Sequence, residues 1–351
     1  MHMADALISP AVGGAMLAVT AGLAVYSARK VKDGMDEKKI PLMGVMGAFV
    51  FAAQMINFTI PATGSSGHIG GGILLSVLLG PYAGFLTMAS ILLIQALFFA
   101  DGGLLAYGCN VFNMGFWTCF VAYPLIYRWF TRKGLSARSI SWGSIFAVVI
   151  ALQLGAFSVV LETLASGKTE LPFLTFVLLM QPIHLAIGLV EGLITAAIVT
   201  YVWKARSEIL EKAALGQALG NISLKKVLTG LAIAVVLVAG SLSWFASSNP
   251  DGLEWSMERT AGTTELEAPD GIHQAMAALQ EKTAFLPDYG FKSSAQAVES
   301  APVEDNGASW PAVDAGTSVA GLLGGALTLG LAALIGCGIS RSRKKAGSVA
   351  A

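Results

Sequence analysis

The chain begins Met1-His2, and a histidine directly after a free amino terminus is a chelating arrangement. The terminal amine, the amide nitrogen of His2 and its imidazole can close two fused rings around one metal ion. A deprotonated amide is a strong-field donor that suits the square-planar geometry of Ni(II) and Cu(II). We expect Met1 to be retained, because residue two is not small. By itself the pair is a weak signal, since a histidine can occupy a frayed terminus by chance.

A second histidine, His68, lies in the glycine- and serine-rich segment 61–72, PATGSSGHIGGG. Its imidazole could supply a fourth nitrogen if this segment lies on the same side of the protein as Met1. The glycines permit tight turns and close helix approach. The alternative is that His68 caps a helix or bonds a loop carbonyl, and the residue alone leaves both open. The predicted metal ligands are therefore Met1, His2 and His68.

Other polar side chains interrupt the apolar stretches, where such groups usually face the interior of a helix bundle. A spacing of three places Asn110 and Asn113 on one helix face, and a spacing of seven places His184 and Glu191 two turns apart. For each of them, hydrogen bonding between helices is the simpler role. The residues that could support the ligands or line a pathway are Gln54, Asn57, Asp101, Asn110, Asn113, His184 and Glu191.

Membrane-spanning helices must position these residues. The 351 residues are 55% hydrophobic and 13% charged, and soluble domains carry about 25% charged residues. Between Ile40 and Tyr127 the only charged residue, with histidine counted as neutral, is Asp101. A hydrocarbon core needs about 20 apolar residues for each helical crossing, so this stretch crosses several times. Continuous apolar runs without alternating polarity favour helices over a barrel.

The sequence predicts an all-α polytopic membrane protein, with about seven transmembrane helices in its first part and two in its second. Segment 69–100 could be one long tilted helix or two short helices that break at Gly80-Pro81. Ser9 and Pro10 are typical of the cap and first residue of a helix, and no cleavable signal peptide is apparent. The predicted spans are 9–28, 41–60, 69–80, 82–100, 108–130, 143–163, 173–203, 228–246 and 319–337.

Basic residues favour two spans within 69–100, because short cytoplasmic loops collect Lys and Arg. These residues gather in four clusters, at 29–39, 128–138, 204–226 and 341–345. Two spans place all four clusters on one side, whereas a single span separates the first from the later ones. We therefore predict nine spans in the inner (cytoplasmic) cell membrane, with the amino terminus outside and the carboxy terminus in the cytoplasm. Met1, His2 and His68 then share the outer side.

The formal net charge of zero hides an uneven distribution. Segment 247–318 contains twelve acidic and three basic residues, a net charge of −9, so the rest of the chain carries +9. We expect this segment to be a small folded or half-ordered extracytoplasmic module. The predicted parts are a membrane metal-binding component (1–203), a charged cytoplasmic linker (204–227), a companion unit (228–340) that includes the acidic loop, and a basic cytoplasmic tail (341–351).

Motifs of the common enzyme classes are absent. The sequence has no H-E-x-x-H, no G-x-S-x-G and no cysteine pair at zinc spacing. Residues 166–169, SGKT, resemble the end of a phosphate-binding loop, but Glu162 stands where its first glycine should be. We therefore predict no ATPase and no other enzyme activity in this chain. The lipid bilayer is a predicted partner and nucleic acid is not.

Several segments resemble the substrate-binding membrane components of cobalt and nickel energy-coupling-factor (ECF) transporters, the CbiM/NikM type. They are MHMADALISP (1–10), GSSGH (64–68), FADGG (99–103), GCNVFNMG (108–115) and HLAIGLVEGLIT (184–195). NPDGLE (249–254) and LPDY (286–289) are similar to the small companion subunit, the CbiN/NikN or PDGLE type. The resemblance covers about 1–337, with the two components fused. Cys109 departs from it, because many relatives have a small residue there.

The resemblance implies that Co(II) or Ni(II) is the transported substrate, with no catalytic cofactor. The implied ligands are the Met1 amine, the His2 amide and imidazole, and the His68 imidazole. Implied partners are a transmembrane coupling (T) component and cytoplasmic ABC-type ATPase subunits, and the companion unit would assist metal loading or gating. Two alternatives remain open: a binding component for an organic micronutrient, in which His2 is incidental, and a membrane enzyme or metal sensor. The sequence does not separate cobalt from nickel.

Overall fold

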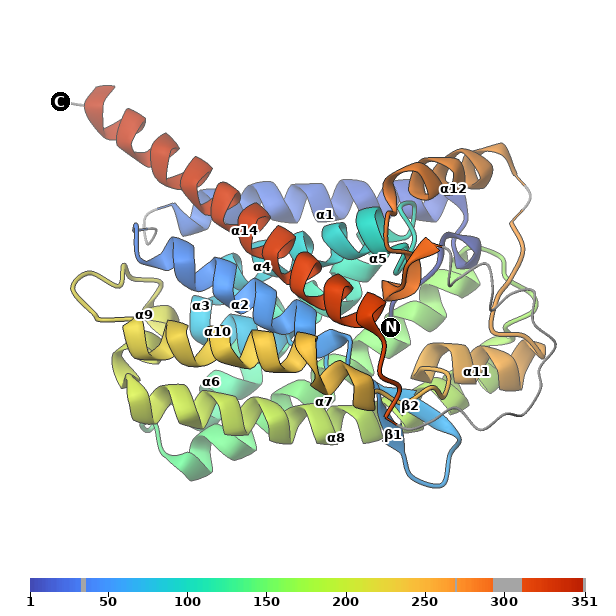
Figure 1. The fold of residues 1–351 in the computed structure, drawn as a ribbon, viewed down its shortest axis with the longest axis horizontal. Coiled ribbons are helices and arrows are strands. Elements are labelled where there is room, and N and C mark those ends of the chain that lie inside the picture. The colour runs from blue at the N-terminus through green and yellow to red at the C-terminus, as the bar shows by residue number, and fades with distance from the viewer. Residues whose placement is uncertain (33–35, 269, 293–310, 350–351) are drawn as a thin grey trace.

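The computed structural model describes residues 1–32, 36–268, 270–292 and 311–349 (Figure 1). It confirms the all-α polytopic membrane fold. Within these ranges, six helical stretches are long and apolar enough to cross a membrane. They are α1 (Pro10–Val31), α4 with its π-helical end (Pro81–Phe99), the continuous stretch Tyr107–Thr131, α7 (Ala137–Ala165), α8 (Phe173–Ala205) and Ala315–Arg343 of α14.

Three shorter apolar helices also lie in the bundle: α2 (Lys39–Gln54), α3 (Gly72–Leu79) and α10 (Lys225–Gly240). The eight residues of α3 rise only about 12 Å, so the predicted span 69–80 is a half-length helix that does not cross a bilayer alone. The chain breaks at Gly80-Pro81 as predicted, with Gly80 at φ 83° and Pro81 as the first residue of α4. Helix α2 ends at Gln54, before the predicted 60, because residues 58–60 form a strand.

The remaining elements are short. The sheet is one antiparallel hairpin, β1 (Phe58–Ile60) with β2 (Ser65–Gly67), in which Thr59 pairs with Ser66. The stretch Tyr107–Thr131 consists of α5 (Tyr107–Val111), the π-helical η3 (Phe112–Tyr127) and α6 (Arg128–Thr131). The other short elements are η1 (Asp5–Leu7), η2 (Gln95–Phe99), α9 (Ser207–Leu215), η4 (Leu242–Phe245), α11 (Gly252–Ala261), α12 (Gly271–Thr283) and η5 (Pro287–Tyr289), while the long helix α14 covers Ala315–Val349 in full.

Helix α1 begins as its sequence predicts and packs closely on α5. Ser9 Oγ accepts a hydrogen bond from the Val12 amide, and Pro10 occupies the first turn. At Gly108 of α5 a Cβ atom would lie 2.4 Å from the Leu17 backbone nitrogen. The close approach of these two helices therefore requires glycine at this position, and it fixes the direction from which the amino terminus enters the bundle.

The two apolar helices of the companion unit, α10 and α14, belong to the same bundle. Helix α14 lies along α2, and α10 packs against both of them (Figure 1). Two glycines of α2 permit this contact: a Cβ at Gly44 would lie 3.1 Å from the Leu329 carbonyl oxygen, and one at Gly47 would lie 3.1 Å from Thr328 Cγ2. The predicted linker contains α9, and the acidic loop contains α11, α12 and η5; residues 293–310 of that loop are outside the described ranges.

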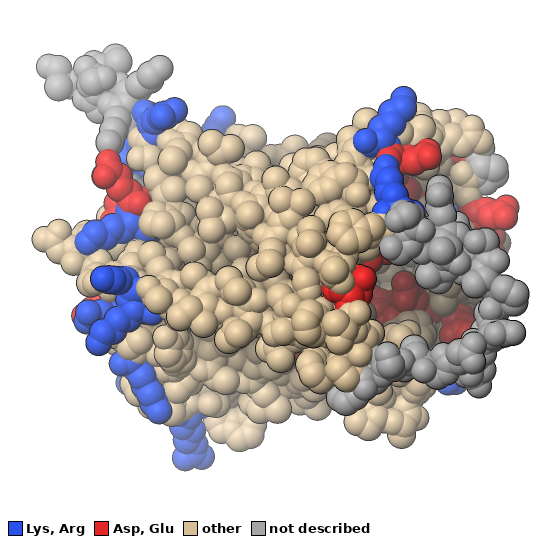
Figure 2. All heavy atoms as spheres, in the orientation of Figure 1, with Lys and Arg blue, Asp and Glu red and all other residues tan. Residues whose placement is uncertain are grey.

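Charged side chains separate along the bundle. Figure 2 shows most Lys and Arg residues at one end, and most Asp and Glu residues near the opposite end. The amino terminus and the hairpin lie at the acidic end, together with α11 and α12 (Figure 1). The two predicted metal-ligating segments therefore meet at one end of the molecule.

Candidate metal centre

The amino terminus is buried among the helices. Met1 is 8% exposed and Met3 is fully buried. The Asn110 side chain accepts a hydrogen bond from the Met3 amide at 2.7 Å and donates one to the Met3 carbonyl at 3.1 Å. The Gly103 amide also donates to this carbonyl, at 2.9 Å. Helix α5 and the preceding loop thereby fix the main chain immediately after His2.

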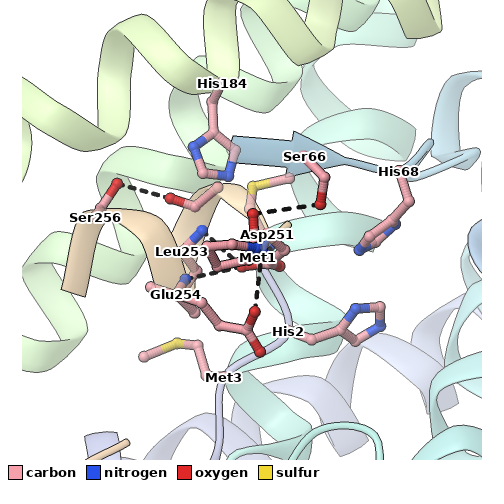
Figure 3. Close-up of polar contacts among 12 residues, drawn as sticks. Met1, His2, Met3, Ser66, His68, His184, Asp251, Leu253, Glu254 and Ser256 are labelled. Carbon is pink, nitrogen blue, oxygen red and sulfur yellow. Dashed lines mark hydrogen bonds and ion pairs between the residues drawn. The ribbon is translucent and has the colours of Figure 1, made fainter. Parts of the chain in front are cut away.

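The imidazoles of His2 and His68 lie side by side, with ring centroids 5.2 Å apart and planes 30° from parallel (Figure 3). Two glutamine side chains, Gln95 and Gln54, connect the two histidine segments through hydrogen bonds. His2 Nε2 lies 3.2 Å from Gln95 Oε1, and Gln95 donates to Gln54 Oε1 at 2.9 Å. Gln54 in turn donates to the Gly70 carbonyl at 2.9 Å, so one hydrogen-bond chain connects His2 to the segment that carries His68.

A carboxylate midway along α8 holds the His68 segment in place. Glu191 accepts hydrogen bonds from the amides of Gly70 and Gly71, at 2.7 and 2.8 Å. Glu191 is fully buried and both of its oxygens are used. On the other side of His68, a Cβ at Gly67 would lie 2.5 Å from Ile187 Cγ1, so the hairpin approaches α8 as closely as glycine allows.

Two histidines present an unprotonated ring nitrogen to a small cavity. His68 Nδ1 lies 3.1 Å from its neighbour's carbonyl, and His184 Nδ1 lies 2.8 Å from the Met180 carbonyl. A carbonyl only accepts, so Nδ1 carries the proton in both rings and Nε2 keeps its lone pair. Metal-binding histidines are commonly oriented in this way. Met1, His68 and His184 line a cavity of about 20 Å³, which holds one ion or one water.

The electrostatic setting of His68 favours the ligand form of its ring. Burial, together with electrostatic repulsion from the neighbouring His2 and amino terminus, lowers the pKa of His68 to about 4. The imidazole is therefore neutral at physiological pH, as metal binding requires. Within the described part of the chain, no three His, Cys, Asp or Glu side chains form a metal-binding group. A metal ion at this position would need main-chain nitrogens as well.

The acidic segment of the companion unit reaches into the centre. Ser66, two residues before His68, donates its amide to the Pro250 carbonyl at 2.8 Å and its hydroxyl to the Asn249 carbonyl at 2.7 Å. Asp251 Oδ2 then lies 3.8 Å from the amino-terminal nitrogen of Met1 (Figure 3). Residues 249–251 thus contact both ligand-bearing segments.

Helix α12 of the companion unit holds the amino-terminal segment from outside. His273 Nε2 lies 2.9 Å from the Asp5 carbonyl and 2.8 Å from the Ile8 carbonyl, while its Nδ1 lies 2.5 Å from Asp270. Gln280 donates to the Gly102 carbonyl at 2.8 Å. The segment after His2 is therefore clamped between α5 and α12.

Asp101 is linked to the companion unit as well. Its Oδ1 lies 3.9 Å from His2 Nδ1, and its other oxygen accepts a short hydrogen bond from the Tyr289 hydroxyl. Tyr289 also receives a hydrogen bond from Gln95. Burial raises the pKa of Tyr289 well above its usual value. The Tyr289 hydroxyl is therefore protonated and can donate to the Asp101 carboxylate.

Two of the polar residues named from the sequence lie further from the imidazoles. Asn113 donates hydrogen bonds to Glu162 at 2.7 Å and to the Met3 sulfur at 3.7 Å, so it lies beside the Met3 side chain. Asn57 lines a larger cavity of about 560 Å³, whose wall also includes His2 and His68. Asn113 therefore contacts the Met3 side chain rather than an imidazole, and Asn57 only shares a cavity wall with His2 and His68.

Sequence reasoning did not identify Asp251, His273 and Tyr289 as site residues. Each lies more than 180 residues after the nearest ligand, and no local spacing relates them to it. The one available signal was that NPDGLE and LPDY recur in a related subunit. That signal shows that the segment is typical of the companion subunit, but it does not reveal which residues the segment contacts.

Residues 2–209 match the family described as the cobalt uptake substrate-specific transmembrane region, CbiM. The chain belongs to the CbiM family. Residues 225–341 match the PDGLE domain. A CbiM region and a PDGLE region are thus fused, as the sequence resemblance predicted. His2 and His68 lie in the first matched region, which begins directly after Met1, whereas Asp251, His273 and Tyr289 lie in the second.

Relatives of known name share this arrangement in whole or in part. The chain is 32% identical over 334 residues to a putative fused nickel transport protein NikMN of Archaeoglobus fulgidus, covering 94% of this chain and 96% of that protein. It is 29% identical over 252 residues to a cobalt transport protein CbiM of Geobacter sulfurreducens, covering 69% of this chain and 70% of that protein. A crystal structure of a truncated transition metal transporter superposes with a TM-score of 0.51 at 33% identity, over 58% of this chain and 99% of that chain.

Proposed function

We propose that this chain is the substrate-binding membrane component of an ECF transporter that imports Co(II) or Ni(II). The observation that carries the proposal is the buried amino terminus, with the His2 ring beside the His68 ring and with Met1 and His68 lining one small cavity. A frayed terminus would need none of the contacts that fix this segment. The names of the relatives, which include both nickel and cobalt transport proteins, support these two metals as substrates.

The proposed ligands are four nitrogens: the Met1 amine, the His2 amide and imidazole, and His68 Nε2. Such a donor set suits late first-row divalent ions in a square-planar field. Asn110 and Glu191 would fix the two ligand-bearing segments, and Gln95 would orient the His2 ring. The donor set binds both Ni(II) and Co(II), and it does not choose between them.

The energy for import would come from partner subunits, a transmembrane coupling component and cytoplasmic ATPases, since the sequence has no ATP-binding motif of its own. The same proposal assigns the basic end of the bundle to the cytoplasm and the amino terminus to the outside of the inner membrane. The positive-inside rule and the separation of charge in Figure 2 support this orientation.

The test is metal titration of the full-length protein with a native amino terminus and no amino-terminal tag. Wild type should bind one Ni(II) or Co(II) per chain. A single glycine added before Met1 should abolish tight binding, because it displaces the amine from the chelate, whereas a glycine added after Ala351 should have no effect. His2→Ala and His68→Ala should each weaken binding. Unchanged metal binding in the amino-terminal extension would contradict the chelate and favour an organic substrate.

A further inference from the structure

We infer that Asp251 of the PDGLE segment is the counter-charge of the metal centre, and that the companion unit strengthens metal binding through this carboxylate. The inference rests on the proposed function. It assigns a binding role to one residue of the fused region, whereas the chelate itself uses only residues of the first region.

The charge of the proposed complex calls for such a group. A divalent ion bound by one deprotonated amide and three neutral nitrogens has a net charge of +1. A buried charge is costly unless an opposite charge pairs with it. The Met1 nitrogen is buried, and Asp251 Oδ2 lies 3.8 Å from it with its own side chain only 16% exposed. The same carboxylate can thus pair with the ammonium group of the empty site and with the cationic complex of the loaded one.

The two oxygens of Asp251 have separate roles. Oδ1 caps helix α11 by accepting hydrogen bonds from the amides of Leu253 and Glu254, both at 2.8 Å. Oδ2 faces the amino terminus. The neighbouring Asp101 approaches His2 from another side, but it is 25% exposed and its second oxygen binds Tyr289. Asp251 is therefore the carboxylate that faces the terminal nitrogen.

The residues around Asp251 hold it rigidly. The Pro250 carbonyl accepts the Ser66 amide and so anchors the segment to β2. At Gly252 a Cβ would lie 3.0 Å from Ile187 Cδ1 and 3.3 Å from His184 Cε1, so the absence of a side chain here lets the segment lie close against α8. Leu253 is buried, and the Glu254 side chain accepts the Asp251 amide at 3.0 Å to complete the cap. Each residue of Pro250–Glu254 thus helps to place one carboxylate oxygen.

The experiment separates the effect of the negative charge of Asp251 from the effect of its capping of helix α11. Asp251→Asn removes the charge and keeps a side chain that caps a helix equally well. The matched control is Asp314→Asn, the same change at the start of α14, where Asp314 accepts the Thr317 amide at 2.7 Å. Ni(II) is titrated into full-length protein with a native amino terminus. Asp251→Asn should weaken binding about 10- to 100-fold, the usual effect of losing a group that supports a metal site. Asp314→Asn should bind as wild type does.

Two further measurements make the result decisive. At saturating Ni(II), the d–d absorption spectrum of Asp251→Asn should equal that of wild type, because the four nitrogen ligands are unchanged. An altered spectrum would identify Asp251 as a direct ligand and overturn the counter-charge. Asp251→Ser, another uncharged cap, should lose as much affinity as Asp251→Asn; a clearly different loss would indicate that side-chain shape matters and would also overturn it.

The outcomes separate this inference from the proposed function. If wild type binds one metal ion and Asp251→Asn binds it equally tightly, the counter-charge is wrong and the chelate stands. If wild type binds no Ni(II) or Co(II), the proposed function itself fails. Thermal unfolding of Asp251→Asn in detergent, compared with Asp314→Asn, shows whether a weaker affinity arises in a folded protein.

Discussion

Side chains of neighbouring helices hold the proposed ligands in place. Asn110 binds both main-chain groups of Met3, and Glu191 binds two consecutive amides after His68. Residue type, the predicted shared side of the membrane and the family resemblance together nominated His2 and His68 from the sequence. The sequence did not reveal which residues support these two histidines, because an amide or carboxylate within the membrane has many potential partners until the positions of the helices are known.

Replacing Glu191 with glutamine tests this support. The side-chain NH₂ group introduced by Glu191→Gln would face one of the two main-chain amides that now donate to the carboxylate, which leaves a buried donor without an acceptor. We expect metal affinity to fall about 10- to 100-fold and stability to fall by about 1–3 kcal/mol. Titration and thermal unfolding measure the two effects. Glu170→Gln, in the exposed loop before α8, should change neither. Wild-type affinity in Glu191→Gln would show that the His68 segment does not depend on this carboxylate.

The ionisation of His68 gives a second prediction at this scale. Metal competes with protons for its ligands, so affinity should fall as the pH falls. Because burial lowers the pKa of His68 to about 4, this ring stays neutral through the whole range from about pH 5.5 to about pH 8. The ratio of the dissociation constants of His68→Ala and wild type should therefore be constant over that range. A ratio that changes near pH 6.5 would mean that His68 titrates as an exposed histidine does.

At the scale of elements, the half-length helix α3 marks the limit of the sequence prediction. The apolar run 69–100 and the break at Gly80-Pro81 were sufficient to predict two helices. They could not reveal that the first one starts inside the bundle, because the amides of Gly70 and Gly71 just before it are bound by Glu191, about 120 residues later in the chain. An apolar run in a sequence indicates that the segment is removed from water, but it does not distinguish a helix buried among other helices from one that faces lipid. The hairpin β1–β2 was missed for a related reason, since its polar partners come from residues 249–250.

The contact between α1 and α5 yields a prediction for these elements. Gly108→Ala would place a Cβ 2.4 Å from the Leu17 nitrogen and 2.5 Å from the Met16 carbonyl carbon, both main-chain atoms that cannot rotate away. We expect a loss of about 1–3 kcal/mol in stability, measured as a lower midpoint of thermal unfolding in detergent. Gly14→Ala on α1, with no atom within 4 Å of the new Cβ, is the matched control and should unfold like wild type. Equal midpoints for the two variants would mean that α1 is free to move away from α5.

For the whole molecule, the fused regions form one helix bundle with opposite charges at its two ends. Composition and the long apolar runs were sufficient to predict a polytopic helix bundle, while the alternation of its helices across the membrane stays a prediction from the basic clusters. The docking of the acidic loop on the amino terminus could not be predicted, because it depends on contacts such as that of His273 with the Asp5 carbonyl, 268 residues apart.

Labelling of single cysteines tests the proposed orientation. Cys109 and Cys119 are buried, so replacing the partly exposed Cys337 leaves a suitable background. In whole cells, a membrane-impermeant maleimide should label Glu265→Cys, in the acidic loop, and should leave Glu211→Cys, on α9, unlabelled. Both positions are exposed, and permeabilised cells should label both. The reverse pattern in whole cells would place the amino terminus in the cytoplasm.

The contacts of the amino-terminal segment with the companion unit have a consequence for biosynthesis. Asp251 lies beside the Met1 nitrogen and His273 beside the Asp5 carbonyl, so these contacts form only after a segment far later in the chain has been translated. Any group that blocks the terminal amine must therefore be removed during that interval, while the terminus is still accessible to processing enzymes. A chain that is processed too slowly would bury a modified amine, lose its pairing with Asp251, and be unable to use that nitrogen as a metal ligand.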